Sequence, residues 1–321
     1  MSNNEQLPRI AVLMAAYNGK FWLTEQVKSI LKQEDVEVTL YISVDQSSDG
    51  TESLIDSLAS SEQRIQVLPH GLHFGGAAPN FYRLIKDVDF STYDFIAFAD
   101  QDDIWNIDKL KRAASVIREK SVDGYSSNVT AFWPNGKTYL INKAQPQTKW
   151  DFLFEAAGPG CTYVLTKPLA LHLQKYINEE WQQVQKVNLH DWLIYAFARA
   201  NNYRWEIDSY SSLLYRQHTN NQVGANVGSR ALFSRFKKIT NGWWLGQVIH
   251  IATLLNLQDQ PFVKSWSDRT RFGYLSLSFH FWQCRRRLRD KFFFLFLNFY
   301  LAIFKPPITN QNQASLDKSA H

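Results

Sequence analysis

An acidic cluster directly follows an apolar run of the chain. Phe95–Ala99, FIAFA, is typical of a buried strand, and Asp100, Asp102 and Asp103 come immediately after it. Carboxylates this close raise one another's pKa and cost stability unless a cation lies among them. Mg²⁺ and Mn²⁺ favour such oxygen ligands and often bind through one or two carboxylates together with substrate phosphates. We therefore predict a divalent-metal site that holds a diphosphate; the alternative is a solvated acidic turn capping a helix that begins near Ile107.

Two further polar loops follow apolar runs nearer the N-terminus. Small residues in Ala15–Gly19, AAYNG, would let a ligand approach the backbone closely, although an ordinary strand-to-helix turn fits as well. In Val44–Thr51, VDQSSDGT, an acidic side chain such as Asp45 could accept hydrogen bonds from a base or a ribose hydroxyl. Asp49 or Ser48 could instead cap the next helix. No G-x-G-x-x-G follows the first apolar run, which disfavours a dinucleotide-binding fold.

A fourth candidate lies at the start of an apolar helix, in His190-Asp191-Trp192. A carboxylate in the first turn of a helix is stabilised by the helix dipole, so Asp191 could be purely structural. A role as general base would require that it lie close to the acidic cluster, which the sequence alone does not show.

The elements that must position these residues alternate in type. Runs expected as strands are Ile10–Ala16, Val38–Val44, Ile65–Leu68 and Phe95–Ala99. Segments expected as helices are Phe21–Leu31, Thr51–Leu58 and one that opens at Pro79–Ile85. This alternation predicts an α/β fold with a mostly parallel sheet and helices on both faces. Ligands of such sheets bind beyond the carboxyl ends of the strands, where the acidic cluster is expected.

The second half of the chain is more varied. We expect a hairpin over Gly124–Ile141, a strand at Cys161–Thr166, a helix at Leu189–Ala200, and strands at Arg204–Ile207 and Leu213–Gln217. These elements suggest an α/β domain over residues 1–228, a helical, basic and aromatic region over 229–307, and a disordered polar tail over 308–321.

The composition fits a globular protein in a reducing compartment. The 321 residues are 45% hydrophobic, with a net charge of +5. Cys161 and Cys284 form no metal or redox spacing, and the N-terminal segment lacks the features of a signal peptide. The run Phe292–Phe304 would form a helix of about 20 Å, shorter than a bilayer core of about 30 Å. We therefore expect a cytoplasmic protein without a membrane span.

Taken together and in order, the motifs resemble family 2 glycosyltransferases, which are inverting, nucleotide-sugar-dependent enzymes with the GT-A fold. The matching stretches are Ala16–Gly19, Asp45–Thr51, Asp100–Asp103, Gly158–Cys161, His190–Trp192 and Tyr215–Gly224. Each is weak alone, whereas the ordered set spans about residues 9 to 225. The combination of D-Q-D-D, H-D-W and R-Q-H-x-x-N-x-x-G is similar to bacterial rhamnosyltransferases of polysaccharide assembly such as O-antigen.

The resemblance implies a role for each matching residue. The nucleotide-sugar donor would be bound by Ala16, Tyr17, Asn18, Asp45, Asp49, Gly75, Asn80, Asp100 and Arg216. Mg²⁺ or Mn²⁺ would be held by Asp102, Asp103 and His218, with Asp102 the first choice. Asp191 would be the general base. His190 stands where the family often has an acidic residue, so the surroundings of Asp191 differ from the family pattern.

The implied reaction is transfer of L-rhamnose from dTDP-L-rhamnose to a hydroxyl of a lipid-linked oligosaccharide in bacterial surface polysaccharide synthesis. One direct displacement at the anomeric carbon would invert its configuration. Two alternatives stay open: the same machinery with a UDP-hexose donor, and a non-catalytic scaffold that binds carbohydrate or membrane. The scaffold is disfavoured because it would need neither Asp102 nor Asp191.

The late segment combines basic and aromatic residues, with Arg285-Arg286-Arg287-Leu288-Arg289 preceding the Phe-rich run. Such a mixture suits a helix at a membrane surface, so we expect peripheral association with the cytoplasmic membrane. The alternative is a helical hairpin that packs on the catalytic domain. Nucleic acid is not expected as a partner, because the basic residues lie beside phenylalanines.

Overall fold

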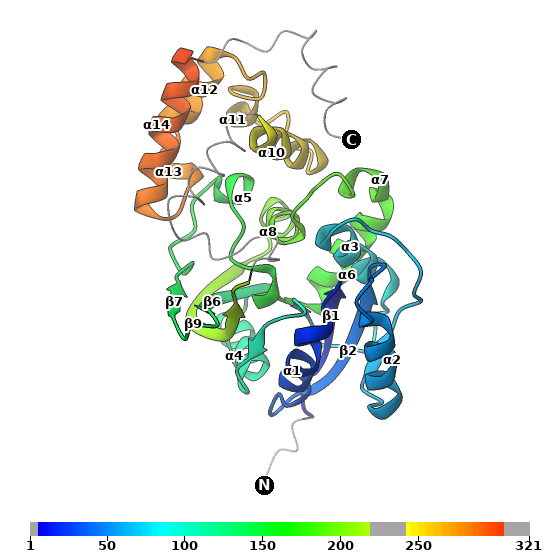
Figure 1. Cartoon of the computed structure of the whole chain (residues 1–321). Coiled ribbons are helices and arrows are strands. Elements are labelled where there is room, and N and C mark those ends of the chain that lie inside the picture. Colours follow the sequence, from blue (N-terminus) through cyan, green and yellow to red (C-terminus); the bar gives the residue numbers. More distant parts are fainter. Residues whose placement is uncertain (1–5, 219–241, 305–321) are drawn as a thin grey trace. The chain divides into compact units, whose positions relative to one another are not determined.

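The computed structural model describes residues 6–218 and 242–304. Two predictions fall elsewhere: the end of the last motif, Thr219–Gly224, and the polar tail both lie outside the described residues. The chain divides into two compact units, one formed by Met1–Ala144 with Ala156–Val227 and the other by Gln145–Glu155 with Gly228–His321 (Figure 1). The short segment before residue 156 therefore belongs with the C-terminal helices, which the sequence does not indicate.

A mixed sheet forms the centre of the first unit. Its strand order is β3-β2-β1-β4-β8-β6-β9-β5, and β7 pairs with β6. The strands are β1 (Arg9–Ala16), β2 (Glu37–Val44), β3 (Ile65–Val67), β4 (Phe95–Ala99), β5 (Ile104–Trp105), β6 (Gly124–Phe132), β7 (Thr138–Ile141), β8 (Val164–Thr166) and β9 (Trp205–Arg216). Strands β1 to β4 pair in parallel, as predicted, whereas β8 runs antiparallel to both of its neighbours.

Helices cover both faces of this sheet (Figure 1). They are α1 (Lys20–Leu31), α2 (Thr51–Ser61), α3 (Ala77–Asp87), α4 (Lys109–Lys120), α6 (Lys167–Glu179), α7 (Trp181–Val184) and α8 (His190–Ala200). Strand β4 is packed on both faces. On one side, Ala97 and Ala99 belong to the core that also holds α1 and α4, and on the opposite side Phe98 packs on Phe81 of α3. A strand buried on both faces needs apolar residues at every position.

Two predicted elements in this unit were wrong in detail. The expected strand at Cys161–Thr166 is a 3₁₀ turn over Gly160–Thr162 followed by the short β8. The two expected strands at Arg204–Ile207 and Leu213–Gln217 are one strand, β9, whose polar middle pairs with β6 through register shifts near Asn128. The expected hairpin is present as β6 and β7.

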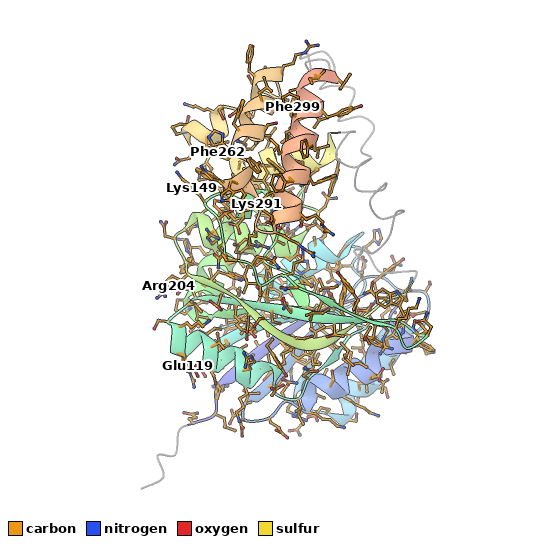
Figure 2. All side chains as sticks on the ribbon, turned by 90° about the vertical axis from the view of Figure 1, so that its left-hand side faces the viewer. Glu119, Lys149, Arg204, Phe262, Lys291 and Phe299 are labelled. Carbon is orange, nitrogen blue, oxygen red and sulfur yellow. The ribbon has the colours of Figure 1, made fainter. Side chains whose placement is uncertain are left out.

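The second unit is helical. Its helices are α5 (Asp151–Phe154), α10 (Trp243–Leu254), α11 (Pro261–Lys264), α12 (Arg271–Phe279), α13 (Phe281–Cys284) and α14 (Leu288–Phe304). Phe154 of α5 lies at its centre and contacts the rings of Phe262, Trp266 and Phe294, with centroids 5.2 to 6.3 Å apart. Figure 2 shows Phe262 within this group of helices. None of the helices in the described ranges is long and apolar enough to cross a membrane.

A buried ion pair also ties Gln145–Glu155 to the C-terminal helices. The guanidinium of Arg286 donates a hydrogen bond of 2.9 Å to the carboxylate of Asp151, and both side chains are almost completely inaccessible to solvent. Arg285 contributes a further hydrogen bond to the carbonyl oxygen of Phe154. Two arginines of the basic cluster Arg285–Arg289 therefore make contacts inside this unit. Removing either Arg286 or Asp151 would leave a buried charge unpaired.

Candidate active site

The acidic loop after β4 brings three potential ligands together in the first unit. One carboxylate oxygen each of Asp100 and Asp103 and the sulfur of Cys161 all lie within 4.8 Å of one another. Burial, together with the charges of Asp102 and Asp191, raises the pKa of Asp100 to about 7. Burial and the charges of Asp100 and Asp102 likewise hold the pKa of Asp103 well above its usual range. The two carboxylates thus disfavour one another's ionised forms, and a bound cation would offset this repulsion.

The end of β9 adds two more predicted residues to this loop. His218 Nε2 lies 2.6 Å from a carboxylate oxygen of Asp102, and its ring stacks on Trp22 with centroids 4.0 Å apart. Arg216 donates from its side chain to the carbonyl oxygen of Asp102, at 2.8 Å, and from its backbone N–H to the carboxylate of Asp103, at 3.2 Å. The antiparallel pairing of β5 with β9 sets this arrangement, because Ile104 directly follows the acidic loop.

The donor set fits a divalent cation. Asp103 is fully buried, and its Oδ2 has no hydrogen-bond partner in the described part of the chain. A buried, unsatisfied carboxylate oxygen beside two more carboxylates is costly in the protein alone and would be relieved by a bound ion. Asp100, Asp102, Asp103 and His218 offer the hard oxygen and imidazole ligands that Mg²⁺ and Mn²⁺ accept.

Asp191 lies in the first turn of α8, close enough to the acidic loop for its charge to raise the pKa of Asp100. Burial raises the pKa of Asp191 itself to about 6, opposed by a hydrogen bond from the Trp192 backbone and by the charge of Lys143. A carboxylate with a pKa near neutrality is well matched to accept a proton at physiological pH. The structure thus supplies the proximity that the sequence could not.

The neighbouring His190 has a structural setting. Its ring stacks on Phe81 with centroids 3.9 Å apart, and burial lowers its pKa to about 3, so it is neutral. A Cβ at Gly160 would lie 2.5 Å from His190 Nε2 and 3.2 Å from Asp191 Cβ. Glycine at this position therefore lets the 3₁₀ turn pass directly over the start of α8.

The loop after β2 uses its carboxylates differently. Asp45 is buried and accepts hydrogen bonds from the backbone N–H groups of Phe74, at 2.8 Å, and Gly75, at 2.9 Å. His73 Nδ1 lies 3.3 Å from the same carboxylate. Asp45 therefore fixes the loop before α3, and the predicted residues Asp45 and Gly75 are in direct contact.

Asp49 caps two helices at once. One carboxylate oxygen accepts from the backbone N–H of Lys20, the first residue of α1, and the other from that of Thr51, the first residue of α2. Burial alone would raise the pKa of Asp49, but hydrogen bonds from Thr51 and Lys20 outweigh it and lower the pKa. Asn18 joins the same loop, because its side-chain oxygen accepts from the Ser48 backbone at 2.8 Å.

The remaining predicted donor residues lie at the ends of β1 and β2. The Asn80 side chain donates to the carbonyl oxygens of Ser43, at 3.0 Å, and Ala16, at 3.5 Å, so it joins the two strand ends. Tyr17 directly follows β1 in the chain, and about half of its surface is exposed. Tyr17 is therefore the residue of this group whose side chain is most accessible to a ligand.

Sequence reasoning gave no role to two residues that support the acidic loop. The Gln101 side chain accepts from the Tyr17 backbone N–H and donates to its carbonyl oxygen, both at 2.8 Å, which joins the acidic loop to the loop after β1. Lys109 is buried over the ring of Trp105, and burial lowers its pKa to about 7 while Cys161 and Asp103 oppose this. A side chain amide between two aspartates, and a lysine in the first turn of a helix, carry no recognisable signal in the sequence.

Comparison with known proteins places this geometry in a family. The family model described as glycosyl transferase family 2 matches residues 11–166. The dTDP-rhamnosyl transferase RfbG of Shigella flexneri is 45% identical over 285 residues, which cover 88% of this chain and 98% of that protein. A β-1,3-glucosyltransferase of Escherichia coli, WfgD, is 28% identical over 162 residues, which cover 50% of this chain and 61% of that protein.

Solved structures share the fold at low sequence identity. Staphylococcus aureus TarS, residues 1–349, superposes with a TM-score of 0.54 at 16% identity, covering 92% of this chain and 90% of that one. The mannosyltransferase PcManGT of Pyrobaculum calidifontis, in complex with GDP-Man and Mn²⁺, gives 0.50 at 15% identity, covering 98% and 87%. The relative matched along nearly its whole length establishes the family, and the chain is a member of glycosyltransferase family 2.

Proposed function

We propose that the protein transfers L-rhamnose from dTDP-L-rhamnose to a hydroxyl of a lipid-linked oligosaccharide, with inversion at the anomeric carbon, in the synthesis of a bacterial surface polysaccharide. The observation that carries the choice of sugar is the 45% identity to the dTDP-rhamnosyl transferase of Shigella flexneri along 98% of that protein. The choice of reaction type is supported by Asp191, a buried carboxylate beside the acidic loop.

In this proposal Asp191 is the general base. Its carboxylate accepts the proton of the acceptor hydroxyl as that oxygen attacks the anomeric carbon from the face opposite the diphosphate. Asp100, Asp102, Asp103 and His218 would hold Mg²⁺ or Mn²⁺ at the diphosphate. When bound, such an ion stabilises the negative charge that builds up on the departing nucleoside diphosphate. No covalent intermediate with the protein is needed.

The loops around the acidic cluster would shape the donor pocket. Tyr17 is exposed at the end of β1 and is held by Gln101, so its ring is available for the nucleotide. Asn18, Asp49 and Asp45 order the adjacent loop after β2, and we assign them to the donor pocket chiefly through this ordering. Arg216 donates to the carbonyl oxygen of Asp102 and to the carboxylate of Asp103, and would hold these two metal ligands in place.

A lipid-linked acceptor would place the enzyme at the cytoplasmic membrane. Both cysteines are free and buried, as suits a reducing compartment. We therefore propose a peripheral enzyme on the cytoplasmic side of this membrane.

The test is a donor screen. The purified protein is mixed with dTDP-L-rhamnose, UDP-glucose, UDP-galactose, UDP-N-acetylglucosamine or GDP-mannose, each with Mn²⁺, Mg²⁺ or EDTA, and unfolding temperature and transfer are measured. A ligand that binds only the folded state raises the unfolding temperature. We expect a metal-dependent rise and turnover with dTDP-L-rhamnose. A response to a UDP-hexose instead would favour the alternative donor, and no response to any donor would favour a non-catalytic scaffold.

A further inference from the structure

The last helix of the second unit has an unusual outward face. On α14, Phe292, Phe293, Phe296, Phe299, Tyr300, Ile303 and Phe304 are all exposed, with 44 to 67% of their surface accessible. Their spacing of three, four and seven residues places them on one side of the helix as a continuous stripe. Exposed apolar surfaces of this extent mark contact sites for proteins or membranes.

Two polar residues of the same helix, Asn298 and Lys291, are buried. Asn298 is buried on the opposite face, where its side chain donates to the carbonyl oxygen of Phe294. Lys291 is also buried and lies over the ring of Trp282, 3.9 Å from its centroid. Figure 2 labels Lys291 at the start of α14 and Phe299 further along it. A helix on a water-exposed surface normally turns its polar face outward, so the arrangement in α14 is reversed.

The stripe continues onto the helix before it. The ring of Phe281 in α13 lies 5.9 Å from that of Phe292, and Trp282 next to it is half exposed. Phe272 and Phe279, two turns apart on α12, are about 80% exposed. Phe281 of α13 therefore extends the stripe, and α12 of the same compact unit carries two further exposed aromatic rings. Aromatic side chains of this kind are enriched where a protein meets the headgroup region of a bilayer.

The charge of this unit complements an anionic surface. Over residues 145–155 and 242–304, the described part of this unit, there are nine lysines and arginines and five aspartates and glutamates. Arg285 and Arg286 are used inside the unit by Phe154 and Asp151, so they do not form the lipid contact that the sequence suggested. Arg289 at the start of α14 leaves two thirds of its side chain exposed next to the stripe. Basic residues beside an apolar surface add attraction to anionic lipids.

We propose that the aromatic stripe of α14 inserts into the interface of an anionic bilayer, with the helix lying along the membrane surface. The helix has 17 residues, about 25 Å, which is too short to span the hydrocarbon core. The inference deepens the proposed function, on which it rests for the location of the acceptor, by assigning the membrane contact to α14 and not to the arginine cluster.

The first experiment is vesicle co-sedimentation of the full chain. The wild type, Phe296→Ser/Phe299→Ser and a matched control, Tyr139→Ser/Leu140→Ser, are mixed with vesicles of phosphatidylcholine alone or with phosphatidylglycerol. The control replaces two side chains of similar exposure on β7. We expect the wild type and the control to bind the phosphatidylglycerol vesicles, and the α14 variant to bind at least tenfold more weakly. Equal binding by all three would overturn the proposal.

A second experiment detects insertion directly and does not require that a variant lose vesicle binding. An environment-sensitive dye is attached at Phe299→Cys or, as the control, at Tyr139→Cys; the native cysteines are buried. Insertion predicts a blue shift of the dye emission on α14 when anionic vesicles are added, and none on β7. If the blue shift on α14 instead follows protein concentration without vesicles, the stripe joins two copies of the chain and the proposal fails.

The proposed function is tested separately in the same samples. Binding of dTDP-L-rhamnose should be the same in the α14 variant and in the wild type, because the stripe lies in the other compact unit from the acidic loop. Normal donor binding with unchanged vesicle binding would overturn the membrane inference alone. Absence of donor binding in the wild type would count against the proposed function.

Discussion

The loops after β2 and after β4 are both rich in aspartate, yet they use their carboxylates in opposite ways. In the first, Asp45 and Asp49 accept hydrogen bonds from backbone N–H groups, and these bonds lower the pKa of Asp49. In the second, Asp100 and Asp103 are buried against other carboxylates, and their pKa values are raised.

This difference separates carboxylates that build the site from carboxylates that can act in it. Hydrogen bonds to the ionised form lower a pKa and stabilise the fold, whereas burial among like charges raises it and costs stability. Strong perturbation in the second direction is a mark of functional groups. The amino-acid composition does not show which loop has which role. Both loops begin with Asp-Gln and contain further aspartates, in DQSSDG after β2 and DQDD after β4.

The largest effect is expected at Asp191. Replacing it by Asn removes the proton acceptor and should lower the transfer rate by about 10² to 10⁴-fold, the usual contribution of a general base. Affinity for dTDP-L-rhamnose, measured by calorimetry, should stay within about threefold, because the base contacts the acceptor. If Asp191→Asn also lost donor binding, Asp191 would be a donor-binding residue and its role as general base would be contradicted.

Asp102→Asn should weaken the dependence on metal. The change removes a ligand charge, so the Mn²⁺ concentration for half-maximal activity should rise by at least about 10 to 100-fold. The matched control is Asp49→Asn, in which the amide oxygen can still cap a helix. If both variants shift the Mn²⁺ requirement equally, the two loops are not functionally distinct.

The pH dependence of transfer should report the raised pKa of Asp191. Burial raises this pKa to about 6, so the base is protonated and inactive below that value. The single-turnover rate at saturating donor and metal should rise about tenfold per pH unit below pH 6 and level off above it. A profile that is flat from pH 5 to 8 would contradict the role of Asp191.

The smallest effect concerns stability. Asp49→Ala removes the cap from both α1 and α2 and should lower the free energy of unfolding by about 1 to 2 kcal/mol, as measured with urea. The wild-type Asp49 pKa is lowered, so its contribution is present above the unfolded pKa near 4 and is lost on acidification. The loss caused by Asp49→Ala should therefore shrink toward pH 3. A loss that is independent of pH would rule out the carboxylate as its source.

The sequence predicted the strands that are marked by a local run of apolar residues. β4 is apolar throughout, β1 is apolar after Arg9 and β2 is mostly apolar, and each was expected with its loop at the correct end. The middle of β9 was missed because its polar residues resemble a loop. They are satisfied by distant partners, since Asp208 binds Arg112 and Ser212 contacts Ser127.

The site shows the same limit. Resemblance identified the aspartates, His218 and Arg216, but their contacts join residues more than a hundred positions apart. Asp49 was foreseen as a possible helix cap, yet its link to α1 across 29 residues was not. Gln101 was passed over because its role exists only once β1 and β4 are neighbours.

The most direct test of the central claim is calorimetric titration of dTDP-L-rhamnose into the wild-type protein with Mn²⁺ and with EDTA. The acidic loop after β4 buries Asp100 and Asp103 beside other carboxylates, so we predict saturable binding with Mn²⁺ and at least about tenfold weaker binding with EDTA. Equal affinity in the two conditions would contradict a metal-dependent donor site at Asp100, Asp102 and Asp103.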